Sequence, residues 1–286
     1  MGSISAQELL DEARRLREDI PNGEGSQFTI AHGEELLNRL GLTRLSAPSE
    51  DITDIQMEVH DTHVGIDQNV GFSVKSYLGG APTLLNASGA TNFVFAIKNL
   101  NKTQADEINA ICTRTKIKDR IDRIYQNGGS LEYMKPASSI FAENLMMIDS
   151  NMDRILAEML LYFYESSVKK CSEVVEHIEQ SNPLNYPRQG IYSYKFKEFL
   201  CAKALGLDPG RLWNGMDDAN GGYIVVKEDG DVVAFHIYDR DIFKQYLLDN
   251  THFEKGSTSK HNYATIYEDN GAMYINLNLQ IRFLSR

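Results

Sequence analysis

Cysteine and long apolar runs are scarce in this 286-residue chain, and each scarcity excludes a class of protein. The three cysteines, Cys112, Cys171 and Cys201, are widely spaced and odd in number, so neither a disulfide framework nor a paired-cysteine zinc site is predicted. No apolar run reaches the length of a membrane span, and charged residues crowd positions 8 to 19, where a signal peptide would be apolar. These absences predict a protein of a reducing, cytoplasmic compartment.

Positive charge is also too scarce for a protein that coats nucleic acid. The 29 lysines and arginines are outnumbered by 40 acids, which gives a formal net charge of −11. Because sequence-independent DNA binding depends on neutralising phosphates, any DNA contact must be a local patch. One basic run lies on a predicted helix, where such runs are more often a solvated face. It comprises Arg114, Lys116, Lys118, Arg120 and Arg123.

The remaining composition is ordinary for a folded protein. Apolar residues make up 42% of the chain and charged residues 24%, so disorder is not indicated. A chain of 286 residues is long enough to bury a sizeable core, as one large domain or two modest ones.

A hairpin with site-like chemistry is predicted early in the chain. Residues 54–61 alternate between apolar and polar, which is the period of a half-buried strand. Residues 62–69 are polar and rich in turn formers, and residues 70–77 alternate again. Asp54 begins the first strand, and Ser73 and Lys75 share one face of the second. We therefore expect the hairpin to bring the Asp54 carboxylate and the Lys75 ammonium together.

These residue types suit phosphodiester hydrolysis. Magnesium prefers oxygen ligands and usually takes one or two carboxylates with water and substrate phosphate, a role that Asp54 fits. A lysine beside the attacking water helps to orient it and offsets phosphate charge, a role that Lys75 fits. An alternating strand with one lysine and one aspartate is also common in mixed α/β proteins, so the local pattern alone leaves an ordinary hairpin open.

The hairpin resembles the PD-(D/E)xK nuclease motif, in which an aspartate is followed on the next strand by acid-x-lysine. Ser73 stands in the place usually held by Asp or Glu. The resemblance implies that Asp54 is a metal ligand, that Lys75 is catalytic and that Ser73 is a weak contributor at the second position. Because a hydroxyl is a weaker magnesium ligand than a carboxylate, either another acid compensates or the site is weak.

Separate blocks along most of the chain are similar, in the same order, to the HpaII-type restriction endonucleases. The blocks are Asp51–Asp61, Gly71–Ser76, Pro82–Ser88, Thr91–Phe93, Gly221–Gly230, His236–Tyr238, Tyr246–Leu248, Ser257–His261 and Leu277–Phe283. The resemblance implies a type II endonuclease that hydrolyses double-stranded DNA at a short CG-containing palindrome, CCGG, with Mg²⁺. Since symmetric sites mirror symmetric dimers, it also implies a homodimer, in a restriction system with a cognate DNA methyltransferase.

The start of the chain departs from the family pattern. No Gly-x-Trp-Ser-Glu block precedes residue 28, so we expect a shortened chain that lacks an upstream acid of the metal site. Four local acids are candidate substitutes: Glu34, Glu35, Glu58 and Asp61. Glu58 is the favoured second metal ligand because it is in phase with Asp54 on the strand, whereas Glu34 and Glu35 fit a solvated helix face better.

Polar residues in two regions are predicted to contact DNA. Arginine reaches O6 and N7 of guanine through two bonds and glutamine suits adenine, so a GC-rich target favours Arg282 over Gln280. Without the resemblance Gln280 and Arg282 would be interpreted as the polar face of a terminal strand. Asn86, Ser88 and Asn92 could equally be residues that cap a turn. The predicted DNA-binding residues are Asn86, Ser88, Asn92, Lys260, His261, Gln280 and Arg282.

The pattern of elements predicts an α/β (α+β) fold, with a mixed β-sheet nuclease core of PD-(D/E)xK type flanked by helices, a helical insertion and C-terminal strands. The expected helices cover residues 6–20, 32–40, 102–126, 138–180 and 194–205, and the expected strands beyond the hairpin cover 222–227, 231–238 and 273–283. A stripe of Met146, Ile155, Met159 and Leu160 is predicted to be core.

One nuclease domain, residues 1–286, is expected. Its parts are an N-terminal helix and catalytic hairpin (1–100), a helical region (101–206) and a β-rich C-terminal region with DNA contacts (207–286). Two rival functions stay open. One is a DNA-binding module, inactive or truncated, and the other is a structural protein with no salt-dependent affinity for DNA.

Overall fold

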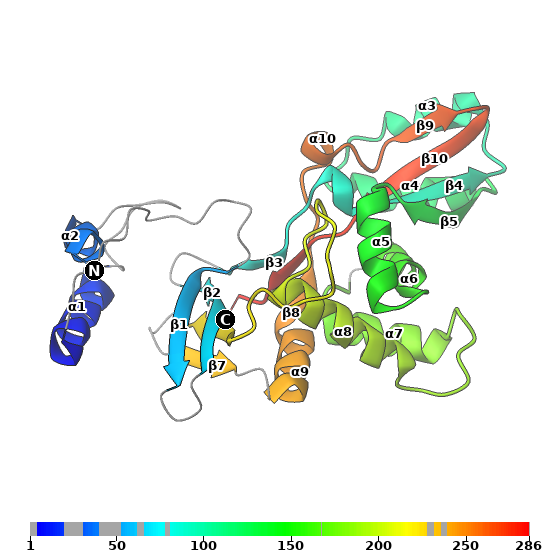
Figure 1. Cartoon of the computed structure of the whole chain (residues 1–286). Coiled ribbons are helices and arrows are strands. Elements are labelled where there is room, and N and C mark those ends of the chain that lie inside the picture. Colours follow the sequence, from blue (N-terminus) through cyan, green and yellow to red (C-terminus); the bar gives the residue numbers. More distant parts are fainter. Residues whose placement is uncertain are drawn as a thin grey trace. The chain divides into compact units, whose positions relative to one another are not determined.

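The computed structural model describes residues 5–19, 31–39, 53–61, 66–77, 81–166, 168–227, 232–235 and 239–285. The chain divides into two compact units (Figure 1). Unit 1 comprises residues 1–82 and 218–238, and unit 2 comprises residues 83–217 and 239–284. The chain therefore passes from unit 1 to unit 2, back to unit 1 and again to unit 2. That the whole chain acts as one nuclease domain stays a prediction.

Unit 1 contains a four-stranded sheet in the order β1-β2-β6-β7. Strands β1 and β2 form the predicted antiparallel hairpin, in which Ile55 lies opposite Phe72. Strand β6 lies parallel to β2, and β7 is antiparallel to β6. The described elements of unit 1 are α1 (Ala6–Asp19), α2 (Ala31–Arg39), β1 (Ile55–Asp61), β2 (Ile66–Ser76), β6 (Gly222–Val226) and β7 (Val232–Phe235).

Unit 2 contains two sheets, in the orders β5-β4-β10-β9 and β3-β11-β8, with helices packed against them. Its strands are β3 (Thr83–Leu85), β4 (Asn92–Lys98), β5 (Ser130–Pro136), β8 (Thr251–Phe253), β9 (Ile266–Asp269), β10 (Ala272–Asn278) and β11 (Ile281–Phe283). Its helices are η2 (Gly89–Thr91), α3 (Lys102–Asn109), α4 (Lys116–Gln126), α5 (Ser139–Ile148), α6 (Met152–Glu165), α7 (Cys171–Ser181), α8 (Ile191–Leu205), α9 (Arg240–Asn250) and α10 (Thr258–His261).

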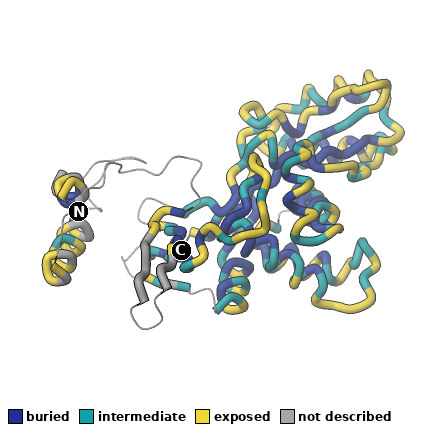
Figure 2. The backbone as a smooth tube through the Cα atoms, in the orientation of Figure 1, coloured by how far each residue is buried: buried dark blue, intermediate teal, exposed yellow. Residues whose placement is uncertain are grey.

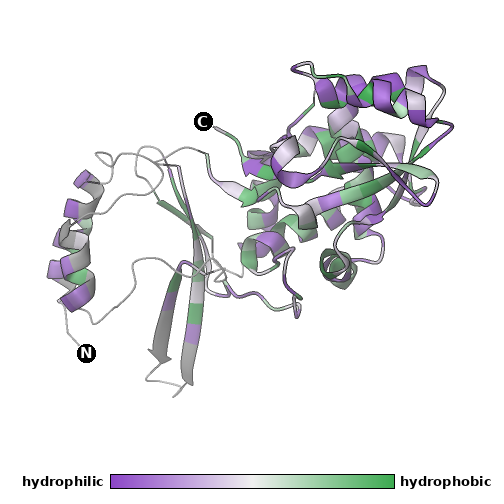
Figure 3. Cartoon of the chain, turned by 90° about the horizontal axis from the view of Figure 1, so that it is seen from above, coloured by the Kyte–Doolittle hydropathy of each residue, from purple (hydrophilic) through white to green (hydrophobic). Residues whose placement is uncertain are grey.

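Helix α6 is at the centre of unit 2, where it contacts α4, α5, α7, α8, β5 and β10. Its buried residues, including Ile155, Met159 and Leu160, recur at the spacing of a helix that is apolar on most of its surface. Figure 2 shows the buried positions of unit 2 along its strands and inner helices, and Figure 3 shows apolar residues there. The predicted mixed α/β fold class is confirmed.

Two predictions of where elements begin and end are wrong. Residues 66–69, expected as a turn, belong to β2, where Asn69 lies opposite Glu58, so strand pairing overrides their turn chemistry. The helix expected over residues 102–126 is two helices, because α3 ends at Asn109. There the Asn109 side chain bonds both the N–H and the C=O of Ile266, at 2.8 Å each.

Two further elements that were predicted to be continuous are divided, and one residue that was predicted to be in the core is exposed. The helix expected over residues 138–180 is three helices, because Asp149 and Ser166 accept the N–H groups of Asn151 and Val168 and so compete with helical bonds. Met146, expected in the core, is 64% exposed. The strand expected over residues 273–283 is divided between β10 and β11, which belong to different sheets.

Candidate active site

Asp54 lies at the end of the hydrogen-bond ladder between β1 and β2. Its main chain makes the last bond of the ladder, and its side chain accepts the next N–H group along β2. Its main-chain N–H donates to the Phe72 carbonyl over 2.9 Å. One step further along β2, the Val74 N–H donates to Oδ2 of the Asp54 carboxylate over 2.6 Å. The Ser73 hydroxyl donates to the same oxygen over 3.3 Å. Neither bond uses Oδ1, so this exposed carboxylate keeps one oxygen for another partner.

Lys75 is two residues beyond Ser73 on β2 and therefore on the same face of the strand. Its side chain is partly buried, and this burial lowers the pKa of the Lys75 ammonium, while the nearby Asp54 carboxylate offsets part of the shift. The structure thus brings Asp54, Ser73 and Lys75 together, as the alternation of the hairpin suggested. The catalytic roles of these residues stay predictions.

Strand β6 fixes the position of β2 through a close contact at Gly71. The Gly71 N–H donates to the Asn220 side chain, and the Gly221 N–H donates to the Gly71 carbonyl, each over 2.8 Å. A Cβ atom at Gly71 would lie 2.4 Å from the Asp218 carbonyl oxygen, so a larger residue would push away the segment that leads into β6. Glycine at this position therefore allows the parallel contact that supports the strand carrying Ser73 and Lys75.

The donor chemistry at Asp54 fits a hard divalent cation, although the described ligands are few. No group of three or more acidic, histidine or cysteine side chains that could hold a metal ion exists among the described residues. Magnesium commonly takes one or two carboxylates and completes its shell with water and phosphate, so an exposed Asp54 is compatible with it. Glu58 lies on β1, but its side chain falls outside the described residues, as do those of Glu34 and Asp61.

The predicted DNA-binding residues all lie in unit 2, and they differ in how accessible they are. Asn86 and Lys260 are exposed, and Ser88 and His261 are partly exposed. Asn92 and Gln280 are buried. The Asn92 amide donates to the His261 carbonyl over 2.9 Å and accepts from the Asn278 amide over 2.7 Å. Asn92 therefore has a structural task that its sequence position did not reveal.

Arg282 is partly exposed but already engaged by an acid. Its Nε donates to Glu254 Oε2 over 2.8 Å, an ion pair that joins β11, the central strand of the β3-β11-β8 sheet, to the residue after β8. Gln280 precedes this strand, and its Oε1 atom is buried without a hydrogen-bond partner among the described residues. The structure does not place these two side chains on one open face as the strand period suggested, because β10 ends at Asn278 and β11 starts at Ile281.

Comparison of the sequence with known protein families identifies the family of this chain. The family model of the HpaII restriction endonuclease matches residues 2–283. The chain belongs to this family. It is 45% identical over 278 residues to the type II restriction enzyme HpaII of Haemophilus parainfluenzae, an alignment that covers 96% of this chain and 77% of that enzyme. No solved structure matches significantly.

Membership of the HpaII family confirms the predicted activity class: the protein is a type II restriction endonuclease, a hydrolase that acts on DNA. No helix in the described part of the chain is long and apolar enough to cross a membrane. Of the three cysteines, Cys112 is exposed, whereas Cys171 and Cys201 are buried as free thiols.

The basic run on α4 does not form one DNA-facing patch in this HpaII-family chain. Arg120 is only 6% exposed, and its guanidinium donates to the carbonyls of Ala264 (2.6 Å), Asn109 (2.7 Å) and Ile111 (3.0 Å). The prediction fails at Arg120 because its helical position faces the interior. Arg114 and Arg123 remain exposed.

We expect Arg120→Ala to lower the free energy of unfolding by about 3 kcal/mol, because three carbonyls lose a charged donor inside the protein. Urea denaturation measures this difference. The matched control is Arg123→Ala on the exposed face of the same helix, which we expect to change stability by less than about 0.5 kcal/mol. Equal effects of the two substitutions would show that the buried bonds of Arg120 do not stabilise unit 2.

Asn278 is buried and holds two segments together, a role that the sequence did not indicate. Its amide donates to the carbonyl of Ser88 (2.7 Å), to Oγ1 of Thr91 (3.2 Å) and to Oδ1 of Asn92 (2.7 Å). These bonds join the end of β10 to the segment before β4 and to the first residue of β4. Because the network is assembled from residues that are about 190 positions apart, no local pattern could have identified it.

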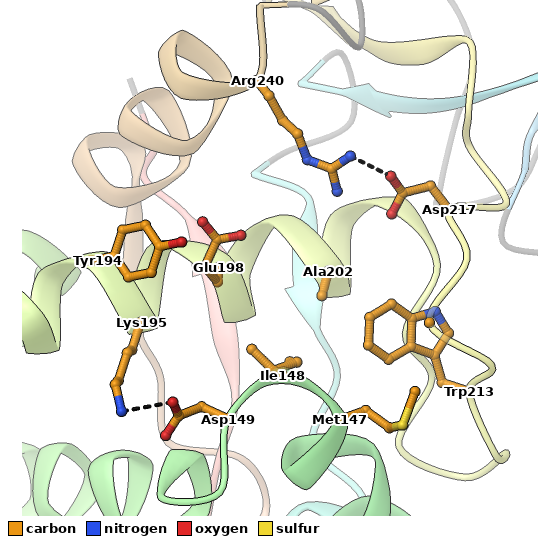
Figure 4. A pocket seen from close by; sticks show the side chains of 11 residues that line it. Met147, Ile148, Asp149, Tyr194, Lys195, Glu198, Ala202, Trp213, Asp217 and Arg240 are labelled. Atoms are coloured by element: carbon orange, nitrogen blue, oxygen red, sulfur yellow. Dashed lines mark ion pairs between the residues drawn. The ribbon is translucent and has the colours of Figure 1, made fainter.

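A pocket of about 290 Å³ lies in unit 2, lined by residues of the end of α5, of α8, of the segment after α8 and of the start of α9 (Figure 4). Its wall carries the ion pairs Lys195–Asp149 and Arg240–Asp217, each 2.7 Å long. The single tryptophan, Trp213, donates its indole N–H to the Met216 carbonyl. The pocket contains none of the predicted catalytic or DNA-binding residues, and we assign it no role in HpaII-family chemistry.

Proposed function

We propose that the protein cleaves double-stranded DNA at CCGG by magnesium-dependent hydrolysis, with Asp54 and Lys75 at the reacting phosphate. The observation that carries this proposal is the convergence of Asp54, Ser73 and Lys75 at one end of the β1–β2 hairpin. The target sequence is supported by similarity to the type II restriction enzyme HpaII.

In this proposal Asp54 holds Mg²⁺ through Oδ1, the carboxylate oxygen that neither Ser73 nor Val74 uses. Glu58, which follows Asp54 on β1, is the proposed second carboxylate. The bound metal would supply charge stabilisation at the scissile phosphate and a more acidic water. Magnesium is favoured over softer metals because the available ligands are oxygens.

Lys75 is proposed to orient the attacking water and to offset phosphate charge. Its partial burial supports this role, because a charge in a less polar environment acts more strongly on a neighbouring phosphate than one in bulk water. The lowered pKa of its ammonium, caused mainly by burial, also makes its proton easier to release than that of an exposed lysine. Asp54 and Lys75 thus complement each other at one phosphate.

The proposed DNA contacts are in unit 2. Exposed Asn86 and Lys260 and partly exposed Ser88 and His261 suit phosphate and base-edge contacts. Arg282 suits guanine, provided that it exchanges its bond to Glu254 for the base. Asn92 and Gln280 are buried, so we propose that they support the exposed residues of this surface and do not contact DNA themselves.

Three further properties follow from this proposed activity. A palindromic target supports a two-fold homodimer, in which each active site cuts one strand. Protection of the host genome would require a cognate methyltransferase as a functional partner. The scarcity of cysteine supports a cytoplasmic location.

The proposal is tested by incubating the purified protein with a duplex that contains one CCGG site, and with a duplex in which that site is CGCG. We expect two discrete fragments from the first duplex with Mg²⁺, none with a chelator, and none from the second duplex. Intact DNA that still binds the protein would favour a DNA-binding module without catalysis, an alternative supported by the serine in place of the motif's second acid. Absence of any salt-dependent DNA affinity would contradict both functions.

A further inference from the structure

Ser73 occupies the position at which related nuclease motifs carry a metal-binding acid, yet its surroundings are those of an interior residue. Its side chain is only 1% exposed. Its hydroxyl has a single proton to donate, and the structure directs it to Oδ2 of Asp54. A hydroxyl buried in this way needs a partner, and the carboxylate provides one.

The bond from Ser73 acts together with a stronger one from the main chain. The Val74 N–H reaches the same Oδ2 atom over 2.6 Å, compared with 3.3 Å for the hydroxyl. Two donors on one oxygen hold the carboxylate in a single orientation. The other oxygen, Oδ1, accepts neither bond and belongs to an exposed side chain.

A magnesium ion needs room for several waters in a nearly octahedral shell. The exposed Asp54 carboxylate has such room, whereas a hydroxyl that is 1% exposed does not. We infer that Ser73 is a positioning residue, which aims Oδ1 of Asp54 at the metal, and that it is not itself a metal ligand. This inference rests on the proposed role of Asp54.

The first test measures Mn²⁺ binding to the metal-free protein by electron paramagnetic resonance, without DNA. We expect Ser73→Ala to raise the Kd for Mn²⁺ about three- to tenfold, because the Asp54 carboxylate then keeps only the bond from the Val74 N–H and is held less firmly. Ser73→Thr keeps the hydroxyl and should stay within about twofold of the wild type. Unchanged Mn²⁺ affinity in Ser73→Ala would overturn the inference. Thermal unfolding of each variant reports whether the fold is kept.

The second test separates positioning from ligation. A thiolate that binds Cd²⁺ gives an ultraviolet charge-transfer band, and soft ions prefer such a ligand. If Ser73 only positions Asp54, Ser73→Cys with Cd²⁺ should show no band beyond that of the wild type, which already contains three cysteines. A new band would place residue 73 in the metal's shell and overturn the inference.

Two experimental results distinguish an error in this inference from an error in the proposed function. If Asp54→Asn binds Mn²⁺ and cleaves as the wild type does, Asp54 is not a ligand and the proposed site is wrong. If Asp54→Asn is inactive but Ser73→Ala binds Mn²⁺ normally, the proposed site stands and only the role given to Ser73 is wrong.

Discussion

Asp54→Asn is expected to slow cleavage of a CCGG duplex by about 1000-fold or more, the equivalent of losing several kcal/mol of metal-assisted stabilisation. The substitution is nearly isosteric. The amide oxygen of the new side chain can still accept the Val74 N–H, so the end of the β1–β2 ladder is kept. What is lost is the negative charge that a hard cation requires. Single-turnover cleavage at saturating protein measures the effect without contributions from product release.

The control for this substitution is Asp269→Asn, which removes an exposed acid at the β9–β10 turn of unit 2. We expect it to cleave within about twofold of the wild type, as surface substitutions away from special features have small effects. DNA affinity of Asp54→Asn, measured with a chelator present, should be unchanged. Cleavage by Asp54→Asn at the rate of the control would mean that another residue holds the metal.

Lys75→Met is expected to abolish detectable cleavage while making the protein more stable. The ammonium is partly buried, and burial disfavours its charged form, as the lowered pKa indicates. Replacing it with an apolar side chain of similar length removes that cost and should raise the free energy of unfolding by about 1 kcal/mol. The matched control, Lys102→Met at the exposed start of α3, should change neither property. Loss of stability together with activity would indicate a structural role for Lys75.

The stability gain of Lys75→Met should depend on pH in a defined direction. Below the lowered pKa of the folded protein the lysine is charged in the folded and the unfolded protein, so the whole cost of burying the charge opposes folding of the wild type. As pH rises towards the unfolded-state pKa of about 10.4, the folded protein releases its proton first and this cost disappears. The difference in unfolding free energy between Lys75→Met and wild type should therefore shrink from pH 7 to pH 10, as measured by urea titrations. A difference that grows with pH would contradict a lowered pKa for Lys75.

The local parts of the site could be predicted because their signals are periodic. Alternation along residues 54–61 and 70–77 indicated both strands of the hairpin and the common face of Ser73 and Lys75. The buried stripe of α6 was likewise visible at Ile155, Met159 and Leu160. In each case the period of the apolar residues along a short segment indicates its secondary structure.

The parts that depend on distant residues could not be predicted. The parallel pairing of β2 with β6 joins Ser73 to a strand about 150 positions later, and nothing in either segment specifies its partner. Arg120 looked like a surface charge until the carbonyls that it binds, one of them at Ala264, were in place. The breaks between α5, α6 and α7 depend on single side-chain bonds to the main chain, which compete with helices that residue preferences favour.

The central claim is that the metal ion used for cleavage is held at the end of the β1–β2 hairpin. The most direct test loads the protein with Fe²⁺ in place of Mg²⁺, adds ascorbate and peroxide, and maps the resulting cuts in the polypeptide by mass spectrometry. Radicals formed at the metal cut the nearest main chain, so we expect cuts around residues 53–55 and 72–75, lost in Asp54→Asn. Cuts confined to unit 2, for example beside Asp149 or Asp217 in its pocket, would contradict the claim.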